Sequence, residues 1–144
     1  MFSDWDIRLA KWIDAIRNKP FQWGPHDCIT FANNAAIQMR GYGFADEFLD
    51  GYSTQRGAMI KYQRFLRKSN YADLIDGLDD RLTRLNTNHA PRGSISAQLS
   101  KNENNVLPLC FGISIGKHIA FVGDNGLVLE YPSENMLYWS LSDG

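Results

Sequence analysis

The sequence has little of three features that would assign a function at once: clustered basic charge, cysteine and long apolar runs. Fifteen basic and sixteen acidic residues give 144 residues a net charge of −1, and no basic run is present. Nucleic-acid binding therefore has no electrostatic support. Two cysteines are too few for the disulfide framework of a small secreted protein, so we expect synthesis in a reducing cytoplasm.

Membrane and secretion signals are also missing. No apolar stretch has the length that a membrane span requires, so we expect no membrane insertion. The first residues are acidic and amphipathic at 3–6, which differs from the basic start and apolar run of a signal peptide. With 44% hydrophobic and 12% aromatic residues, and no internal repeat, the chain is predicted to be one folded domain over residues 1–144.

The first half of the chain predicts helices, because its apolar residues recur at helical spacing. Ser3 and Asp6 match a capping box at the start of the first helix, and Asp27 is a good N-cap for the second. The predicted helices run from Ser3 to the stop at Pro20, from Cys28 to Gly41, over 54–68 and over 72–85.

The second half predicts strands joined by turns. Hairpin signals are present at Gly116-Lys117 and at 124–126. The predicted strands cover 94–99, 106–115, 118–122, 127–131 and 136–141, with a polar loop at 101–105. Helices followed by an antiparallel meander predict an α+β fold, in which N-terminal helices pack on a C-terminal antiparallel sheet.

The most informative segment is Pro25-His26-Asp27-Cys28, at the start of the second predicted helix. A cysteine there faces the positive end of the helix dipole and unpaired backbone N–H groups, which favour the nucleophilic thiolate. We therefore expect a lowered pKa for Cys28. Cys28 is a catalytic nucleophile, the relic of one, or a core residue, since free cysteine often simply packs.

A catalytic thiol needs a base, usually a histidine. His26 is only two residues from Cys28, too close to bring its ring to the sulfur across a helix start. His89 lies in a polar loop, where we expect it to be solvated. His118 opens a strand of the predicted sheet and is the candidate base for Cys28.

These parts, in this order, resemble the NlpC-like cysteine peptidases, a papain-like superfamily of peptidoglycan hydrolases. The nucleophile of that family follows an aspartate at a helix start, as in Asp27-Cys28-Ile29-Thr30-Phe31. The family's Gly-Asp dipeptide corresponds to Gly93-Ser94, and its His-x-Gly-Ile strand to Cys110-Phe111-Gly112-Ile113. The resemblance thus places Cys110 where the family has its base histidine, and a thiol is a poor substitute for imidazole.

The closer resemblance is to small NlpC-like proteins encoded among tail genes of tailed phages. The shared segments are Trp23-Gly24-Pro25-His26-Asp27-Cys28, Gly51-Tyr52-Ser53-Thr54, the Gly112-Ile113 hairpin strand and Trp139. The resemblance covers nearly the whole chain. It implies a papain-like fold without cofactor or metal, and a tail-tip or baseplate component that is made in the host bacterial cytoplasm and carried in the virion. Its partners would be other tail proteins, in an assembly holding several copies of the chain.

Strand parity constrains the base. A two-residue turn at 116–117 pairs Ile115 with His118 and Ile113 with Ala120. Cross-strand partners share a face, and alternate residues change face. His118 is therefore predicted on one face of the sheet and Cys110 on the other, so that Cys28 can face one of them but not both.

Three functions remain open. The chain is a structural tail subunit with degenerate or weak peptidase chemistry, or an active endopeptidase or amidase that cuts peptidoglycan stem peptides during genome entry. In the active form Cys28 and His118 would be catalytic, and N–H groups at the helix start would form an oxyanion hole. A metal site from Cys28, His26, Cys110 and His118 ranks lowest, because its spacing matches no common ligand pattern.

Residues 44–62 combine aromatic side chains and glycines without regular periodicity. Such a segment is a candidate contact surface, since aromatic residues are enriched in interface cores. Phe48 and Tyr52 would then contact another tail protein. The alternative is that the segment covers the domain's own core. Aromatic residues here, with Trp23 and Tyr42, could also line a groove for a peptide or glycan.

Overall fold

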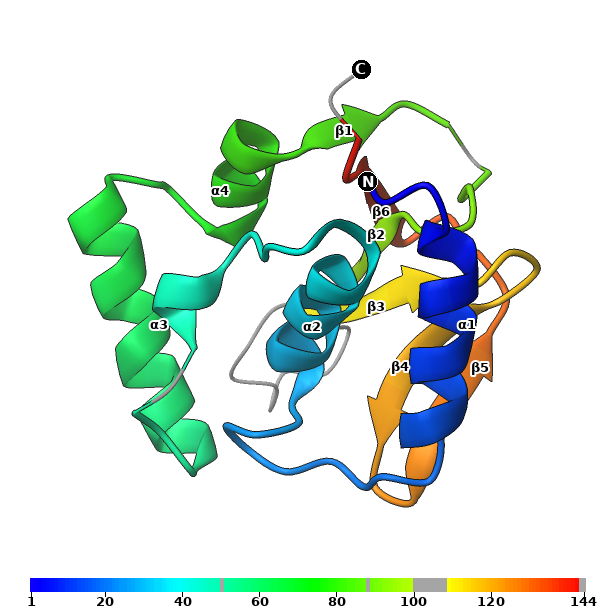
Figure 1. The fold of residues 1–144 in the computed structure, drawn as a ribbon. Helices are drawn as coiled ribbons and strands as arrows, with labels where there is room; N and C mark the ends of the chain where they lie inside the picture. Colours follow the sequence, from blue (N-terminus) through cyan, green and yellow to red (C-terminus); the bar gives the residue numbers. More distant parts are fainter. Residues whose placement is uncertain (50, 88, 100–108, 143–144) are drawn as a thin grey trace.

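The computed structural model describes residues 1–49, 51–87, 89–99 and 109–142, and it has the predicted α+β architecture (Figure 1). Helices fill the first half of the chain and strands the second. The helical elements are α1 (Trp5–Ile16), α2 (Cys28–Arg40), the short 3-10 helix η1 (Asp46–Phe48), α3 (Gln55–Ser69) and α4 (Leu74–Arg81). The strands are β1 (Thr83–Leu85), β2 (Ile95–Leu99), β3 (Leu109–Ser114), β4 (Ile119–Gly123), β5 (Gly126–Glu130) and β6 (Met136–Ser140).

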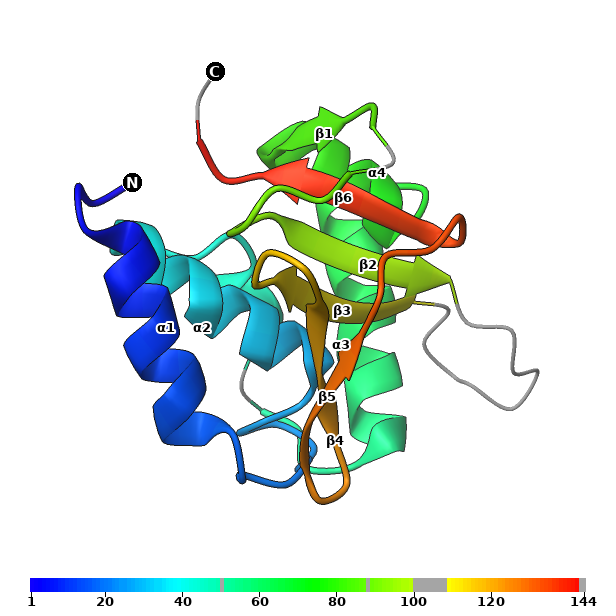
Figure 2. The ribbon, with the colours of Figure 1, turned by 90° about the vertical axis from the view of Figure 1, so that its right-hand side faces the viewer.

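The described strands form one antiparallel sheet in the order β1-β6-β2-β3-β4-β5. Figure 2 shows β1, β6, β2 and β3 side by side in this order. The last strand, β6, inserts between β1 and β2, so the chain end is tied into the sheet next to elements from its middle. The predicted packing of N-terminal helices on a C-terminal antiparallel sheet is therefore confirmed.

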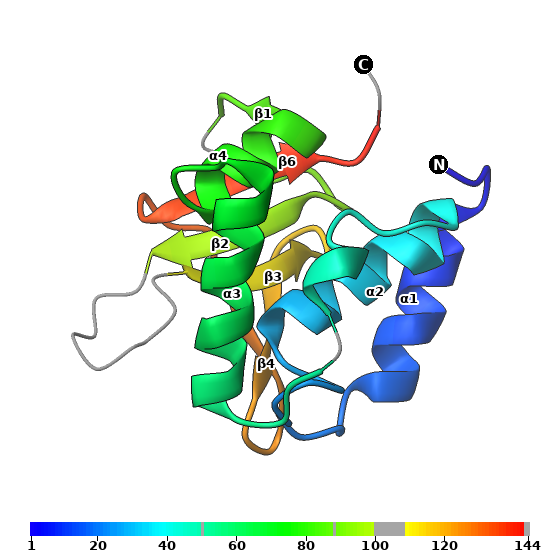
Figure 3. The same ribbon diagram turned by 90° about the vertical axis from the view of Figure 1, so that its left-hand side faces the viewer.

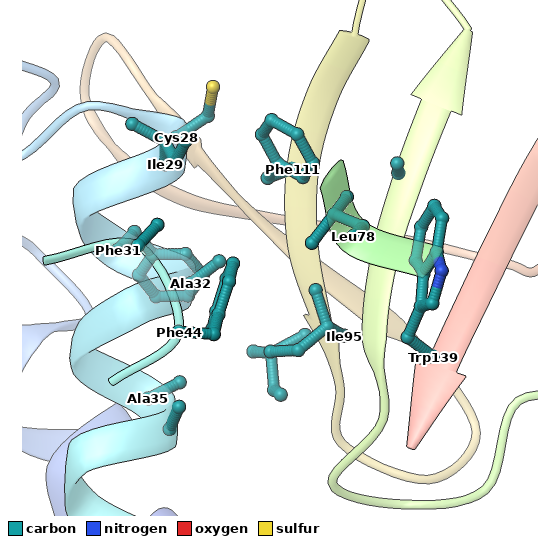
Figure 4. Close-up of a cluster of buried hydrophobic side chains, with 14 of the residues drawn as sticks. Cys28, Ile29, Phe31, Ala32, Ala35, Phe44, Leu78, Ile95, Phe111 and Trp139 are labelled. Carbon is teal, nitrogen blue, oxygen red and sulfur yellow. The ribbon is translucent and has the colours of Figure 1, made fainter. Parts of the chain in front are cut away.

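Helix α2 is the central helix, because its buried face lies against β3 (Figure 4). Alanines on that face let the helix pack closely on the sheet. Phe31, Ala32, Ala35 and Ala36 are all fully buried. The helix ends at Gly41, which has a left-handed φ of 88°. Its N–H donates to the Ile37 carbonyl and closes the last turn.

The other helices surround this pair of elements. Helix α1 packs along α2, where Trp12 stacks on Phe31 with ring centroids 5.2 Å apart. Figure 3 shows α3 on the opposite side of α2 from α1. Helix α3 meets η1 through Phe65 and Phe48, whose rings lie 5.8 Å apart.

Part of the segment that follows α2 belongs to the core. Phe48 is 1% exposed and lies against aromatic rings of its own chain. The buried Asn33 side chain fixes the segment by accepting the backbone N–H groups of Phe44 and Ala45 at 2.8 and 2.9 Å. Phe48 therefore covers the core, as in the alternative, and is not the predicted contact residue. Tyr52 is half-buried, and its contact with another protein stays a prediction.

The predicted helix over 72–85 is too long. It ends at Arg81, and residues 83–85 form β1, which pairs with β6 through Arg84↔Trp139. Arg84 also forms a two-pronged ion pair with Asp79, at 2.8 and 2.9 Å, and Asp79 accepts the Trp139 indole N–H at 2.9 Å. These contacts with the last strand outweigh the helical periodicity of the leucines, which is a local preference only.

The helix starts were predicted with mixed success. Helix α1 has Asp4 in the N-cap position without a side-chain capping bond, so the Ser3–Asp6 capping box is wrong. Asp27 caps α2 as predicted. Strands β2 to β6 agree with the predicted segments to within a few residues; the polar loop at 101–105 and the beginning of the segment 106–115 lie outside the described residues. In the described part of the chain, no helix combines the length and apolar character of a membrane span.

Candidate functional site

Cys28 is the first residue of α2, and a tight turn before it sets its position. Gln22 and His26 exchange backbone hydrogen bonds of 3.1 and 3.0 Å, which closes residues 22–26 into a loop. The chain therefore enters α2 from a fixed direction, with Asp27 extended at the N-cap position and Cys28 beside β3.

The Asp27 carboxylate is the centre of a hydrogen-bond network at this helix start. It is 1% exposed, and it accepts three bonds: from the Thr30 N–H at 2.9 Å, the Gly24 N–H at 3.0 Å and the Tyr52 hydroxyl at 2.5 Å. The Thr30 hydroxyl in turn donates to the Gly24 carbonyl at 2.8 Å. The turn, the helix and the segment around Tyr52 are thereby joined at one carboxylate.

Gly24 cannot be replaced without moving this network. Its φ is +93°, and a Cβ there would lie 2.4 Å from the Tyr52 carbonyl oxygen. Two segments of the phage-protein resemblance, Trp23–Cys28 and Gly51–Thr54, thus meet in space. This contact could not be predicted from the sequence, because an aspartate–tyrosine pair 25 positions apart has no periodic signature.

Tyr52 acts as a donor in this network. Burial, followed by the hydrogen bond to Asp27, raises the pKa of Tyr52 far above its ordinary value. The hydroxyl therefore keeps its proton and remains bound to the carboxylate. This side chain also lies close to the Cys28 thiol, which adds to the rise.

Cys110, the second residue of β3, is close enough to Cys28 for each thiol to shift the pKa of the other. Both cysteines are free thiols. Cys28 is 7% exposed, and Cys110 is half-buried.

The pKa of Cys28 shifts in the direction opposite to that expected from its helix-start position. Interaction with the Cys110 thiol raises it, burial raises it further, and the Phe111 backbone N–H opposes both. Interaction with Cys28 lowers the pKa of Cys110, although burial opposes it. Interaction with another thiol and burial therefore outweigh the dipole of α2 at Cys28.

His118 lies away from this pair. The predicted hairpin register is confirmed, since Ile113 pairs with Ala120 and the Ile115 N–H donates to the His118 carbonyl at 2.9 Å. His118 is therefore at the turn end of the β3–β4 hairpin, and five residues of extended chain, about 17 Å, separate Ile115 from Cys110. The His118 ring packs against Tyr131 at 4.7 Å, and its role as a base stays a prediction that no described contact supports.

The other two histidines also make no described hydrogen bond with the Cys28 sulfur. His89 is exposed, as predicted. His26 is 2% exposed, packs edge-on against Phe31, and its Nε2 has no hydrogen-bond partner among the described residues. Burial, and then the charge of Lys19, lower the pKa of His26 below 6.5, although Asp27 opposes them.

We expect His26 to make the protein sensitive to acid. A histidine whose folded pKa is lowered contributes stability that is complete above pH 6.5 and lost as pH falls through that value, because the unfolded chain then binds a proton that the folded chain does not. The free energy of unfolding should fall by up to about 1.4 kcal/mol per pH unit below 6.5.

Urea unfolding between about pH 5 and about pH 8 measures this slope in wild type, His26→Phe and His89→Gln. His26→Phe should flatten the profile and His89→Gln should leave it as in wild type. Equal slopes in wild type and His26→Phe would show that other groups cause the acid loss.

A small cavity lies on the core side of the residues next to the two cysteines. Its volume is about 20 Å³, and it is lined mainly by apolar residues, among them Ile29 and Phe111, together with Arg81. This volume is close to that of one water molecule.

The predicted aromatic groove for a peptide or glycan is wrong in part. Phe44 and Phe48 are core residues, whereas Tyr42 is exposed beneath the Arg40 guanidinium.

Two further roles were predicted for this region: an oxyanion hole at the helix start and a metal site. Asp27 already occupies the Thr30 N–H through its side chain and the Phe31 N–H through its carbonyl, so these donors are not directed at an oxyanion. In the described ranges, no group of three or more histidine, cysteine and acidic side chains is placed to hold a metal ion. The proposed set of Cys28, His26, Cys110 and His118 therefore does not converge.

A model of a protein family described as "Domain of unknown function (DUF6950)" matches residues 1–141. The match spans every described helix and strand, from α1 to β6. No curated protein matches the chain.

Proposed function

This chain belongs to the DUF6950 family of unknown function, and we propose that it is a structural subunit of a phage tail tip or baseplate, built on an NlpC-like domain whose peptidase chemistry is degenerate. The tail assignment rests on the resemblance of the segments around Cys28, Tyr52 and Trp139 to small phage tail proteins. In this function the chain is carried in the virion and bound to other tail proteins, in several copies.

One observation supports the loss of peptidase activity: Cys110, a thiol, stands where the resemblance places the base histidine. A thiol peptidase acts through a thiolate that a neighbouring imidazole creates and protects. Here the partner of Cys28 is a thiol that raises the pKa of Cys28, so Cys28 keeps its proton at neutral pH. Burial of the sulfur further limits attack on a peptide bond.

The surviving parts of the site support a structural use. Asp27, Gly24, Thr30 and Tyr52 tie three segments together at the helix start, and this network does not depend on a reaction. The intact Asp27-Cys28 pair at the start of α2 favours the second candidate, an active endopeptidase or amidase for peptidoglycan stem peptides.

Hydrolysis separates the two candidates. Purified protein, Cys28→Ala and His118→Ala are incubated with peptidoglycan fragments, and the products are followed by mass spectrometry. We expect no cleavage above the Cys28→Ala background. Cleavage by wild type that both substitutions abolish would establish the enzyme, and cleavage lost only in Cys28→Ala would identify another base.

Particle composition tests the assembly. Purified tails of the encoding phage should contain this chain at a fixed ratio to the other tip proteins, and phage carrying Cys28→Ala should infect as well as wild type. A chain that is absent from finished particles would contradict the tail function. Particles of normal composition that fail to deliver their genome with Cys28→Ala would favour the peptidase.

A further inference from the structure

Helix α3 carries charge of one sign only. It has no acidic residue and five basic ones, which form its basic face: Arg56, Lys61, Arg64, Arg67 and Lys68. At 3.6 residues per turn, these positions lie within about 140° of the helix circumference. The apolar residues on the other side, among them Tyr62 and Phe65, pack against the core. All members of the basic face except Lys61 are exposed, so α3 presents this charge to solvent.

Helix α4, the next helix of the chain, has the opposite charge on its outer side. The N-cap residue and three residues of the helix form its acidic face, and all are exposed: Asp73, Asp76, Asp79 and Asp80. They occupy one sector of about 120°, opposite the buried Leu74 and Leu78. The basic residue of α4, Arg81, is partly buried and pairs with Glu47. The outer side of α4 is therefore acidic alone.

The two charged faces lie on the same side of the molecule, where α3 and α4 follow each other (Figures 1 and 3). They do not neutralise each other. In the described ranges, no ion pair includes a member of the basic face, and in the acidic face only Asp79 has one, with Arg84. The charge of α3 is therefore available to groups outside the chain.

A surface that combines both signs fits a second copy of the chain better than a polyanion. DNA or an anionic membrane would be attracted by the basic face and repelled by the acidic face beside it. Across a two-fold axis, α3 of one copy can face α4 of the other, and symmetry repeats the contact in reverse. Ile60, 43% exposed on the same side of α3 as the basic residues, adds an apolar contact, which interface cores favour.

We propose that the outer sides of α3 and α4 form a dimerisation surface for a second copy of this chain, with the basic face of each copy docked on the acidic face of the other. This contact goes beyond the proposed tail function and does not rest on it. Exposed ion pairs are individually weak and are screened by salt, so the dimer should be reversible and sensitive to ionic strength.

Sedimentation velocity over a series of protein concentrations tests the contact. Wild type should dimerise in about 50 mM sodium chloride, with a dissociation constant at least about tenfold higher in about 500 mM. Arg64→Glu with Arg67→Glu, the α3 variant, and Asp76→Lys with Asp80→Lys, the α4 variant, should each dimerise at least about tenfold more weakly than wild type at low salt. Each variant brings like charges together in both contacts of its own dimer.

A mixture of the two variants makes the test specific. An equimolar mixture should dimerise more tightly than either variant alone, because one of its two contacts joins an unchanged basic face to an unchanged acidic face. Lys11→Glu with Lys117→Glu is the matched control. It changes the net charge as the α3 variant does, at exposed residues outside α3 and α4, and should dimerise as wild type does.

Four results would overturn the proposal: wild type that stays monomeric at about 100 μM in low salt, a dimer that the α3 variant leaves unchanged, a mixture no tighter than its components, or growth beyond a dimer, which indicates a head-to-tail contact. A monomer that binds duplex DNA or phosphatidylserine vesicles through α3 would assign the basic face to a polyanion instead. Circular dichroism verifies folding, and Arg64→Gln with Arg67→Gln replaces an α3 variant that unfolds.

Discussion

Replacing Cys110 with histidine should make Cys28 react with iodoacetamide about 10 to 100 times faster at about pH 6 than in the Cys110→Ser variant. Cys28 is the only thiol in both variants, so the alkylated site is unambiguous. Mass spectrometry of timed samples gives the rate. This substitution restores the residue type that the resembling peptidases have at this position.

The expected gain follows from the contacts of Cys28. An imidazole in place of the Cys110 thiol can take the Cys28 proton, and the resulting thiolate keeps the helix start and the Phe111 N–H as stabilising partners. The negative charge of Glu130, which already acts on position 110, favours the imidazolium form. The pKa of Cys28 should therefore fall from above to below its ordinary value. The gain in thiolate exceeds the loss of nucleophilicity that accompanies a lower pKa.

His118 supplies the internal control. Adding His118→Ala to Cys110→His should leave the alkylation rate unchanged, because His118 is at the turn end of the hairpin and packs on Tyr131. Equal rates for Cys110→His and Cys110→Ser would mean that position 110 is not the base position. A rate that falls with His118→Ala would restore His118 as the base.

The fold could be predicted from local signals wherever those signals agreed with the packing. The alanine-bearing face after Cys28 packs on the sheet, and the turn at 116–117 sets the register of β3 and β4. The helix over 72–85 failed because its last residues pair with β6, at the far end of the sequence. Pattern cannot detect such a partner, and tertiary pairing overrides a weak helical preference.

At the candidate site, the cap of α2 was predicted correctly and the direction of the Cys28 pKa shift was not. Capping by Asp27 and the closeness of Cys28 and Cys110 follow from the helix start and the resemblance. The lowered pKa of Cys28 was wrong, because the dipole argument does not include burial or a thiol as the nearest neighbour. The role of Tyr52 was missed for a similar reason: its partner lies in another segment.

The aromatic segment shows the same limit. Phe48 and Tyr52 have the composition of an interface, yet Phe48 is in the core and Tyr52 is bonded to Asp27. Composition does not distinguish an interface core from a domain core, because both bury aromatic rings against apolar neighbours. Only the packing of α3 on η1 decides between them here.

The largest loss of stability should come from Asp27→Ala, which we expect to lower the free energy of unfolding by about 3 to 5 kcal/mol. The substitution removes the N-cap of α2 and leaves three donors without their acceptor: the Gly24 and Thr30 N–H groups and the Tyr52 hydroxyl. Hydrogen bonds to a charged acceptor contribute more than neutral ones, and a buried donor without a partner keeps its desolvation cost.

Asp73→Ala is the matched control, because Asp73 caps α4 through the Asp76 N–H at 2.8 Å but is exposed and makes no comparable set of bonds in the described residues. It should cost about 1 kcal/mol, the ordinary value of an N-cap. Urea midpoints of the folded variants measure both. Adding Tyr52→Phe to Asp27→Ala should recover only part of the lost free energy of unfolding, since the two backbone donors still lack an acceptor. If Asp27→Ala costs no more than Asp73→Ala, the carboxylate is only a cap, and the joining of the turn, α2 and the Tyr52 segment must come from packing alone.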